Sequence, residues 1–160
     1  MKHKIIGIAC TIIFSIIVTN ASAQTNEKIK LLTSIKWQRA GWTVDPAYQM
    51  RGNWPVTTDL WEYESACLKE DYYVFAEDGN YKIINESNDC PGKNIGFSGV
   101  GKWKMNPKTN KLYLGDEKKG YSTRDVLEIT ATKLVLTIFT IQKGVKYTFT
   151  ETYKPKINYN

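Results

Sequence analysis

The sequence predicts an all-β fold, an eight-stranded antiparallel up-and-down barrel with one long connection after the first strand. Three observations support this. Short segments rich in β-branched and aromatic residues alternate apolar with polar positions, which is typical of half-buried strands. Turn signals separate these segments. Most of the turns are too short to join anything but antiparallel neighbours. Eight such strands close readily into a small barrel, whose interior is filled or holds one small ligand.

The pattern favours eight strands, separated by turn residues. In the first, Ile35, Trp37 and Arg39 fall on one face. Between the second and third, Asp78-Gly79 predicts a tight hairpin, because such a turn needs a positive φ that glycine adopts without steric cost. The strands are expected over residues 31–43, 71–77, 80–85, 99–105, 111–115, 121–130, 133–141 and 145–153.

The connection over residues 44–70 is unusually long for a compact domain, and such connections are often functional. Asp59 with Glu62 three residues later predicts a one-turn helix that begins with a capping box. Trp54 and Trp61 lie in this connection and Trp42 just before it. Two interpretations stay open: the three tryptophans pack the connection over one barrel mouth as a lid, or they form an exposed surface for a partner.

The N-terminal residues have the pattern of a cleaved export signal. Lys2 and Lys4 precede an apolar run over residues 5–18, and Ala21-Ser22-Ala23 supplies a small-residue cleavage site. We therefore expect a leader over 1–23 and a single domain over 24–160, exported to the periplasm or the medium. A membrane anchor is the weaker alternative, because the run is shorter than the roughly 20 residues of a spanning helix. Lipidation at Cys10 is weaker still, since Cys10 lies inside the run. No second such run follows, so no membrane span is expected after cleavage.

The composition excludes most catalytic chemistry. The one histidine, His3, lies in the predicted leader, so residues 24–160 contain no Ser-His-Asp or Cys-His arrangement and no histidine-ligated zinc. Loss of Lys2 and Lys4 lowers the formal charge from +6 to +4, and the remaining charges are mixed, without the basic stripe of a nucleic-acid binder. We predict no enzyme activity, no cofactor, no metal and no nucleic-acid partner.

Cys67 and Cys90 are the two cysteines beyond the leader. An oxidising compartment favours one disulfide between them over two free thiols. The bridge would close a loop of about 24 residues, which contributes roughly 3 kcal/mol in the chain-entropy model. It would also join the end of the long connection to the loop after the hairpin.

Several segments in order resemble the lipocalin-like domain proteins that bacteria export. Lys36-Trp37 resembles the family's first strand, where a tryptophan closes the barrel bottom. The hairpin bracketed by Cys67 and Cys90 and the Gly101-Lys102-Trp103 segment are also similar. The remaining similar segments are Leu127-Glu128-Ile129-Thr130, Leu134-Val135-Leu136 and Tyr147-Thr148-Phe149-Thr150. The resemblance implies a lipocalin-like barrel over most of residues 31–154.

The leading functional hypothesis is a secreted or periplasmic binding protein for a small, partly apolar molecule. Aromatic walls would desolvate the ligand, while tyrosine hydroxyls and Arg39 or Arg124 would orient its polar end. The candidate ligand-binding residues are Trp37, Phe75, Tyr81, Trp103, Leu136, Ile138, Tyr147 and Phe149. The alternative is a solid-core interaction module or inhibitor that contacts another envelope protein through the Trp42–Trp61 connection. The sequence does not identify a protein partner.

Overall fold

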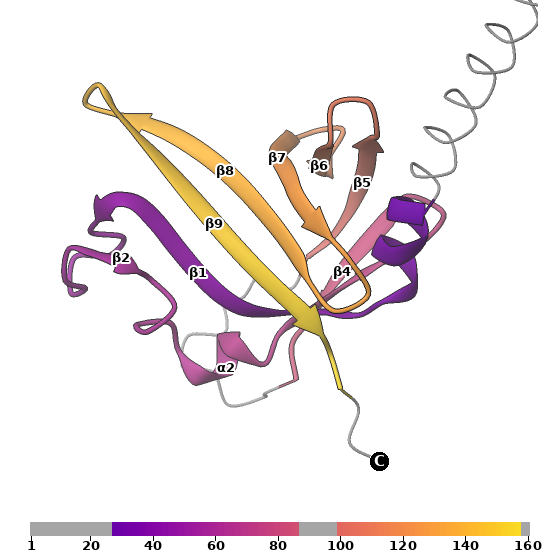
Figure 1. Cartoon of the computed structure of the whole chain (residues 1–160), viewed down its shortest axis with the longest axis horizontal. Helices are drawn as coiled ribbons and strands as arrows, with labels where there is room; N and C mark the ends of the chain where they lie inside the picture. Colours follow the sequence, from indigo (N-terminus) through magenta and orange to yellow (C-terminus); the bar gives the residue numbers. More distant parts are fainter. Residues whose placement is uncertain (1–26, 87–98, 158–160) are drawn as a thin grey trace, which may run out of the picture.

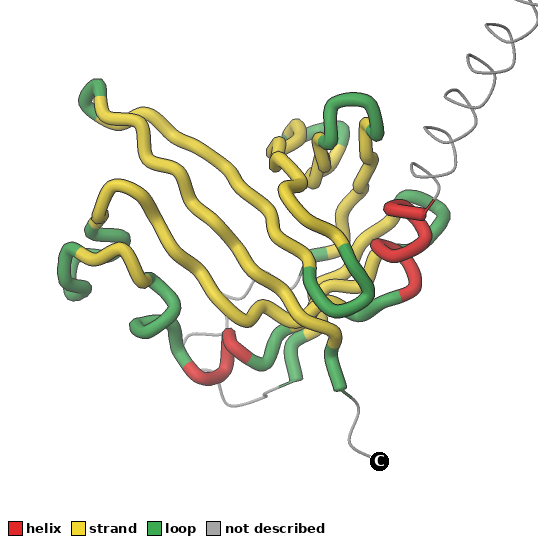
Figure 2. Tube along the Cα trace, viewed as in Figure 1, coloured by secondary structure: helices red, strands yellow, loops and turns green. Residues whose placement is uncertain are grey.

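The computed structural model describes residues 27–86 and 99–157, drawn in colour in Figure 1. Nearly all regular structure in this part of the chain is β (Figure 2). The strands are β1 (Trp37–Tyr48), β2 (Thr57–Asp59), β3 (Tyr72–Phe75), β4 (Asn80–Ile84), β5 (Val100–Asn106), β6 (Lys111–Asp116), β7 (Gly120–Ile129), β8 (Leu134–Gln142) and β9 (Val145–Pro155). A short helix, α2 (Ala66–Lys69), precedes β3.

The strands form one antiparallel sheet that closes on itself. Its order is β2-β1-β3-β4-β5-β6-β7-β8-β9, and β1 also pairs with β9. Eight strands therefore make a closed up-and-down barrel, and β2 is an additional strand on the edge of β1. The predicted fold class is confirmed. At the β8–β9 turn, Lys143 and Gly144 both have positive φ, of 50° and 79°, which suits the twist of a two-residue hairpin.

The start of the first strand differs from the prediction. Residues 27–34 are helical, and β1 begins only at Trp37. Ile29 and Leu32 face one side of this helix, and Ile35 follows directly after its end. All three belong to the core or pack against it. The strand also runs beyond the expected end at residue 43, to Tyr48.

The long connection is more structured than the sequence indicates. β2 pairs with the far end of β1, in a register that joins Thr43 to Asp59. The predicted one-turn helix at Asp59 is wrong. The Asp59 carboxylate accepts hydrogen bonds from the backbone N–H groups of Trp61 (3.0 Å) and Glu62 (3.3 Å), but only a turn follows. The helical turn of this connection is α2.

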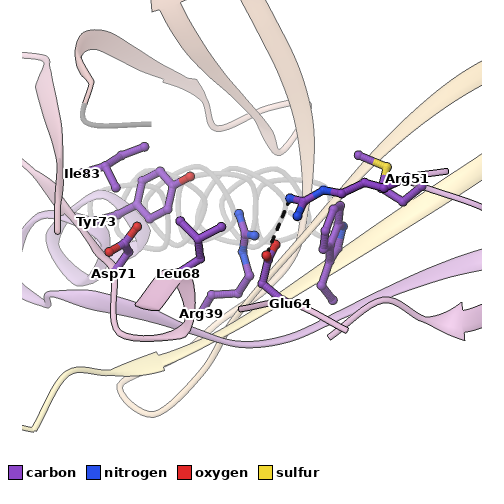
Figure 3. A pocket seen from close by; sticks show the side chains of 9 residues that line it. Arg39, Arg51, Glu64, Leu68, Asp71, Tyr73 and Ile83 are labelled. Atoms are coloured by element: carbon purple, nitrogen blue, oxygen red, sulfur yellow. Dashed lines mark ion pairs between the residues drawn. The ribbon is translucent and has the colours of Figure 1, made fainter. Parts of the chain in front are cut away.

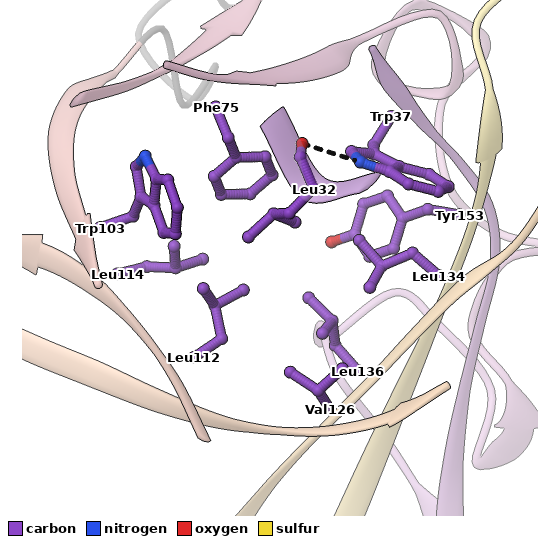
Figure 4. Packing of buried hydrophobic residues seen from close by; sticks show 10 residues of the cluster. All are labelled: Leu32, Trp37, Phe75, Trp103, Leu112, Leu114, Val126, Leu134, Leu136 and Tyr153. Carbon is purple, nitrogen blue, oxygen red and sulfur yellow. Dashed lines mark hydrogen bonds between the residues drawn. The ribbon is translucent and has the colours of Figure 1, made fainter. Parts of the chain in front are cut away.

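One end of the barrel is filled by a group of ten buried side chains, which we call the floor cluster (Figure 4). The Trp37 indole N–H donates a hydrogen bond to the Leu32 carbonyl (3.2 Å), which ties the N-terminal helix to β1. The space between these side chains does not admit a water molecule. The floor cluster consists of Leu32, Trp37, Phe75, Trp103, Leu112, Leu114, Val126, Leu134, Leu136 and Tyr153.

Beyond the floor cluster, two pairs of neighbouring strands stop pairing. β1 pairs with β3 only at Trp37 and Gln38, and β7 pairs with β8 only as far as Thr137. Beyond these points β1, β2, β8 and β9 continue as a separate twisted sheet, which we call the upper sheet (Figure 1). A second buried group, the tryptophan cluster, packs on it. Its members are Trp42, Val44, Trp54, Leu60 and Phe149.

Candidate functional site

Three charged side chains meet inside the barrel, between the floor cluster and the tryptophan cluster. Arg39 of β1 lies 3.1 Å from Glu151 of β9, and Arg124 of β7 lies 3.3 Å from the other oxygen of the same carboxylate. The Tyr153 hydroxyl donates a hydrogen bond to Glu151 (3.0 Å). Glu151 is only 7% exposed, so a buried carboxylate serves two arginines at once.

A bulge in β1 follows Arg39 directly. In the β1–β9 register Arg39 faces Tyr153 and Gly41 faces Thr152, so Ala40 is an extra residue. The extra residue reverses the alternation of the strand. Arg39 points inward by the regular alternation from Trp37, and the bulge turns Trp42 inward as well. The Arg39 guanidinium lies 5.5 Å from the Trp42 ring.

The protonation states of this group follow from its surroundings. Burial and the charge of Glu151 raise the pKa of Tyr153 and of Tyr73, so both hydroxyls keep their protons. Burial alone lowers the pKa of Arg39, but Tyr153 and Glu151 raise it by more, and the guanidinium keeps its charge. Two cations share one carboxylate. Arg39 Nε is buried and has no hydrogen-bond partner among the described residues.

A hollow of about 240 Å³ lies beside this group, and we call it the Arg39 hollow. Figure 3 shows the Arg39 side chain between Leu68 and Glu64. Arg51 lies 3.6 Å from the buried Glu64 carboxylate at one side of it. The residues that line the hollow are Arg39, Trp42, Met50, Arg51, Glu64, Leu68, Asp71, Tyr73 and Ile83.

Asp71 is a carboxyl of this hollow whose pKa is raised toward neutral pH. Burial raises its pKa, Arg39 lowers it, and the carboxylates of Glu70 and Glu64 raise it again, to a net value of about 6. The carboxyl therefore changes charge just below neutral pH. The polarity of the hollow changes with it.

A second hollow adjoins the first. It is an open groove of about 290 Å³ on the inner face of the upper sheet, and we call it the Phe149 groove. Both hollows are lined by Trp42 and Met50, so they lie on either side of these two residues. The groove is lined by Trp42, Tyr48, Met50, Ile138, Phe139, Thr140, Gln142 and Phe149. One hollow is thus charged and the other apolar.

The structure divides the predicted ligand-binding residues between two places. The floor cluster contains Trp37, Phe75, Trp103 and Leu136, and Tyr81 packs against it. The Phe149 groove is lined by Ile138 and Phe149, and Tyr147 packs on the tryptophan cluster. The eight residues therefore do not surround one common space.

The three connection tryptophans lie largely inside the protein. Trp42 and Trp54 are 9% and 7% exposed, with ring centroids 6.4 Å apart, and Trp61 is partly buried against the same cluster. Cys67 lies in α2, whereas Cys90 and the leader over 1–23 lie outside the described residues, so the disulfide and the leader stay predictions. Within residues 27–86 and 99–157, no helix is long and apolar enough to cross a bilayer.

Several residues of the hollows were not singled out from the sequence. Glu151 falls on the same face of β9 as Phe149 and Tyr153, so its inward position could have been found from the alternation alone. Arg51, Glu64 and Asp71 come from the connection and its end. Their meeting depends on how the connection folds back, and no local pattern indicates it.

No protein-family model and no curated protein matches this chain. Among solved structures it is similar to the bovine lipocalin allergen Bos d 2, with 13% identity and a TM-score of 0.40 over 78% of this chain and 73% of that one. It is also similar to bovine odorant-binding protein, solved with a selenium-containing odorant. That match has 14% identity and a TM-score of 0.43, over 81% of this chain and 74% of that one. These structural neighbours are lipocalins.

Proposed function

We propose that this protein binds a small, partly apolar molecule and does not catalyse a reaction on it. The observation that carries the proposal is the Arg39 hollow, a space with charged and apolar walls beside a filled barrel floor. Ligand sites are typically apolar spaces with a few converging polar groups. In keeping with the leader pattern, we place this activity outside the cytoplasm, in the periplasm or the medium.

The two hollows suggest how the ligand lies. Its polar end would occupy the Arg39 hollow, where Arg39, Asp71 and Tyr73 offer charge and hydrogen bonds. Its apolar part would pass Trp42 and Met50 into the Phe149 groove. The combined space, about 240 and 290 Å³, is comparable to the pockets of roughly 300–1,000 Å³ that hold small ligands.

A ligand screen followed by one filling substitution tests the proposal. Trp42 lines both hollows, so tryptophan fluorescence and thermal shift should respond to a bound ligand. The screen would use fatty acids, sterols, bile acids and haem. Leu68→Trp places a larger side chain in the Arg39 hollow, and we expect it to weaken the best ligand about tenfold or more.

Val100→Trp is the matched control. Val100 is 73% exposed and lines neither hollow, so it adds the same side chain without filling the site. Affinity should be unchanged in this variant. A ligand that binds Leu68→Trp as tightly as the wild type, or the absence of any responding ligand, contradicts the proposal.

A further inference from the structure

The tip of the β8–β9 hairpin exposes large apolar side chains. Phe139 is 55% exposed, Ile141 64% and Val145 42%. Figure 1 shows this hairpin extending beyond the end of β1, so its tip is the outermost part of the upper sheet in that view. Phe139 and Ile141 lie on one face of the hairpin together with Lys146, and Val145 pairs with Gln142 on the other face. Single exposed apolar residues are normal, but three at one projecting end of the sheet call for an apolar contact.

The charges of the hairpin itself have one sign, and the carboxylate of Asp45 lies on the neighbouring strand β1, opposite Thr148. Lys143 lies in the turn, and the Lys146 ammonium lies 4.7 Å from the centre of the Phe139 ring. No acidic residue occurs from Leu134 to Thr150. The next acid along the chain, Glu151, is buried and engaged by Arg39 and Arg124. The tip therefore combines apolar side chains with two cations and no neighbouring carboxylate in its own strands.

We propose that the β8–β9 tip docks on a lipid bilayer that contains anionic headgroups. Phe139, Ile141 and Val145 would enter the interface, while Lys143 and Lys146 bind the lipid phosphates. Apolar side chains flanked by lysines bind membrane interfaces in this way, through buried area and attraction to anionic lipids.

The size of the tip favours a bilayer over a protein partner. Stable protein interfaces use roughly 20–30 residues on each side, whereas the tip offers only one turn and the residues beside it. A lipid surface adapts its shape to a few inserted side chains. Docking would also bring the Phe149 groove to the bilayer, since Thr140 and Gln142 of the same hairpin line that groove.

Vesicle co-sedimentation tests the proposal on the chain that begins at Gln24. This chain contains every described element and lacks the apolar run over residues 5–18, which would itself bind lipid. The probes are vesicles of phosphatidylcholine alone and of phosphatidylcholine mixed with phosphatidylglycerol. The wild type should bind the mixed vesicles, and added salt should weaken this binding because exposed charges are screened.

Two double variants separate the two contributions. Phe139→Ser with Ile141→Ser should lower binding about tenfold by removing the inserted side chains. Lys143→Glu with Lys146→Glu should lower it about tenfold or more, since each lysine contributes to the attraction. Leu127→Ser, at a site that is 65% exposed, and Lys118→Glu with Lys119→Glu in the β6–β7 turn are the matched controls and should bind as the wild type does.

Three outcomes would overturn the proposal. The first is that the wild type sediments with neither kind of vesicle, and the second is that the control variants lose binding as strongly as the hairpin variants. The third is that the double serine variant binds vesicles as the wild type does and differs only in self-association, measured by gel filtration. The tip would then be a contact between copies of this chain. Circular dichroism of each variant checks that the barrel is intact.

Discussion

The floor cluster and the upper sheet are built from some of the same strands, yet their interiors differ. The floor is packed with apolar and aromatic side chains and leaves no room for water. Just above it, Arg39, Arg124 and Glu151 are held inside the barrel, and two hollows open beside them. The change occurs where β1 leaves β3 and β8 leaves β7. The closed end is therefore expected to supply most of the stability, and the open end supplies the space in which we propose that a ligand binds.

The largest effect is expected from truncation in the floor. Trp37 is fully buried and donates its indole N–H to Leu32. Trp37→Ala removes that bond and leaves a cavity in a close-packed region, at a cost of about 4 kcal/mol in the free energy of unfolding. Urea denaturation measures the loss.

Trp54→Ala is the matching tryptophan truncation in the tryptophan cluster, which packs on the upper sheet. Trp54 is 7% exposed, but it lies outside the strands, in the connection between β1 and β2. We expect a loss of about 2 kcal/mol, because the cost of truncation depends on how far a site can collapse. Equal losses at Trp37 and Trp54 would contradict the assignment of stability to the floor.

The next effect concerns the buried charges. Glu151→Gln leaves Arg39 and Arg124 close together with no carboxylate between them. Breaking a buried ion pair costs about 3–5 kcal/mol, and the two arginines are about one-fifth exposed, so we expect about 3 kcal/mol. Denaturant unfolding tests this value.

Glu128→Gln provides the control for that experiment. Its carboxylate pairs with Lys133 at 2.9 Å, but both side chains are more than 40% exposed. Pairs of this kind contribute about 0–1 kcal/mol. If the losses at Glu151 and Glu128 were similar, the central charges would not be a special feature of this barrel.

The sequence predicted inward positions of the floor, but neither that they fill it nor the structure of the open end. Alternation along the strands identified Trp37, Phe75, Trp103 and Leu136 as inward, and tight turns identified the order of the strands. Residues 31–34, the second half of the helix over 27–34, were predicted as strand, because apolar positions near Ile35 fit a period of two as well as the helical one. The helix is favoured because its apolar side packs on the floor cluster.

The Arg39 hollow depends on features that local patterns do not contain. The extra residue Ala40 reverses the alternation in β1, and a single sequence gives no sign of a bulge at that position. Glu64 and Asp71 reach the hollow only because the connection folds back over β1. Arg39 and Arg124 were both predicted to orient a polar group. Their shared partner, Glu151, follows from the closure of β9 on β1.

Asp71 makes the stability of the open end depend on pH. Its pKa rises from about 3.8 to about 6 in the fold, so the folded state binds the proton more tightly than the unfolded state. Stability from this group is therefore present below pH 4 and is lost as the pH rises through about 6. Because Asp71 is partly exposed, we expect an effect on the order of 1 kcal/mol.

Asp71→Asn isolates this contribution. The difference in unfolding free energy between the variant and the wild type should increase from acidic to neutral pH in favour of the variant. Urea unfolding at several pH values measures it, since all other titrating groups are common to both proteins. A difference that does not change with pH would mean that Asp71 titrates as an exposed carboxyl and that the Arg39 hollow does not perturb it.

The smallest effect is expected at the outer end of the upper sheet. The Tyr48 hydroxyl donates a hydrogen bond to the Gln142 side chain (3.0 Å), across the Phe149 groove. Tyr48→Phe removes only this bond and keeps the ring, which lies 4.8 Å from Tyr147 and 5.8 Å from Phe149. Since the bond is exposed, its loss should cost about 0.5 kcal/mol in urea unfolding. A loss above about 1.5 kcal/mol would show that a polar contact holds the groove together, and the open end would then contribute to stability as the floor does.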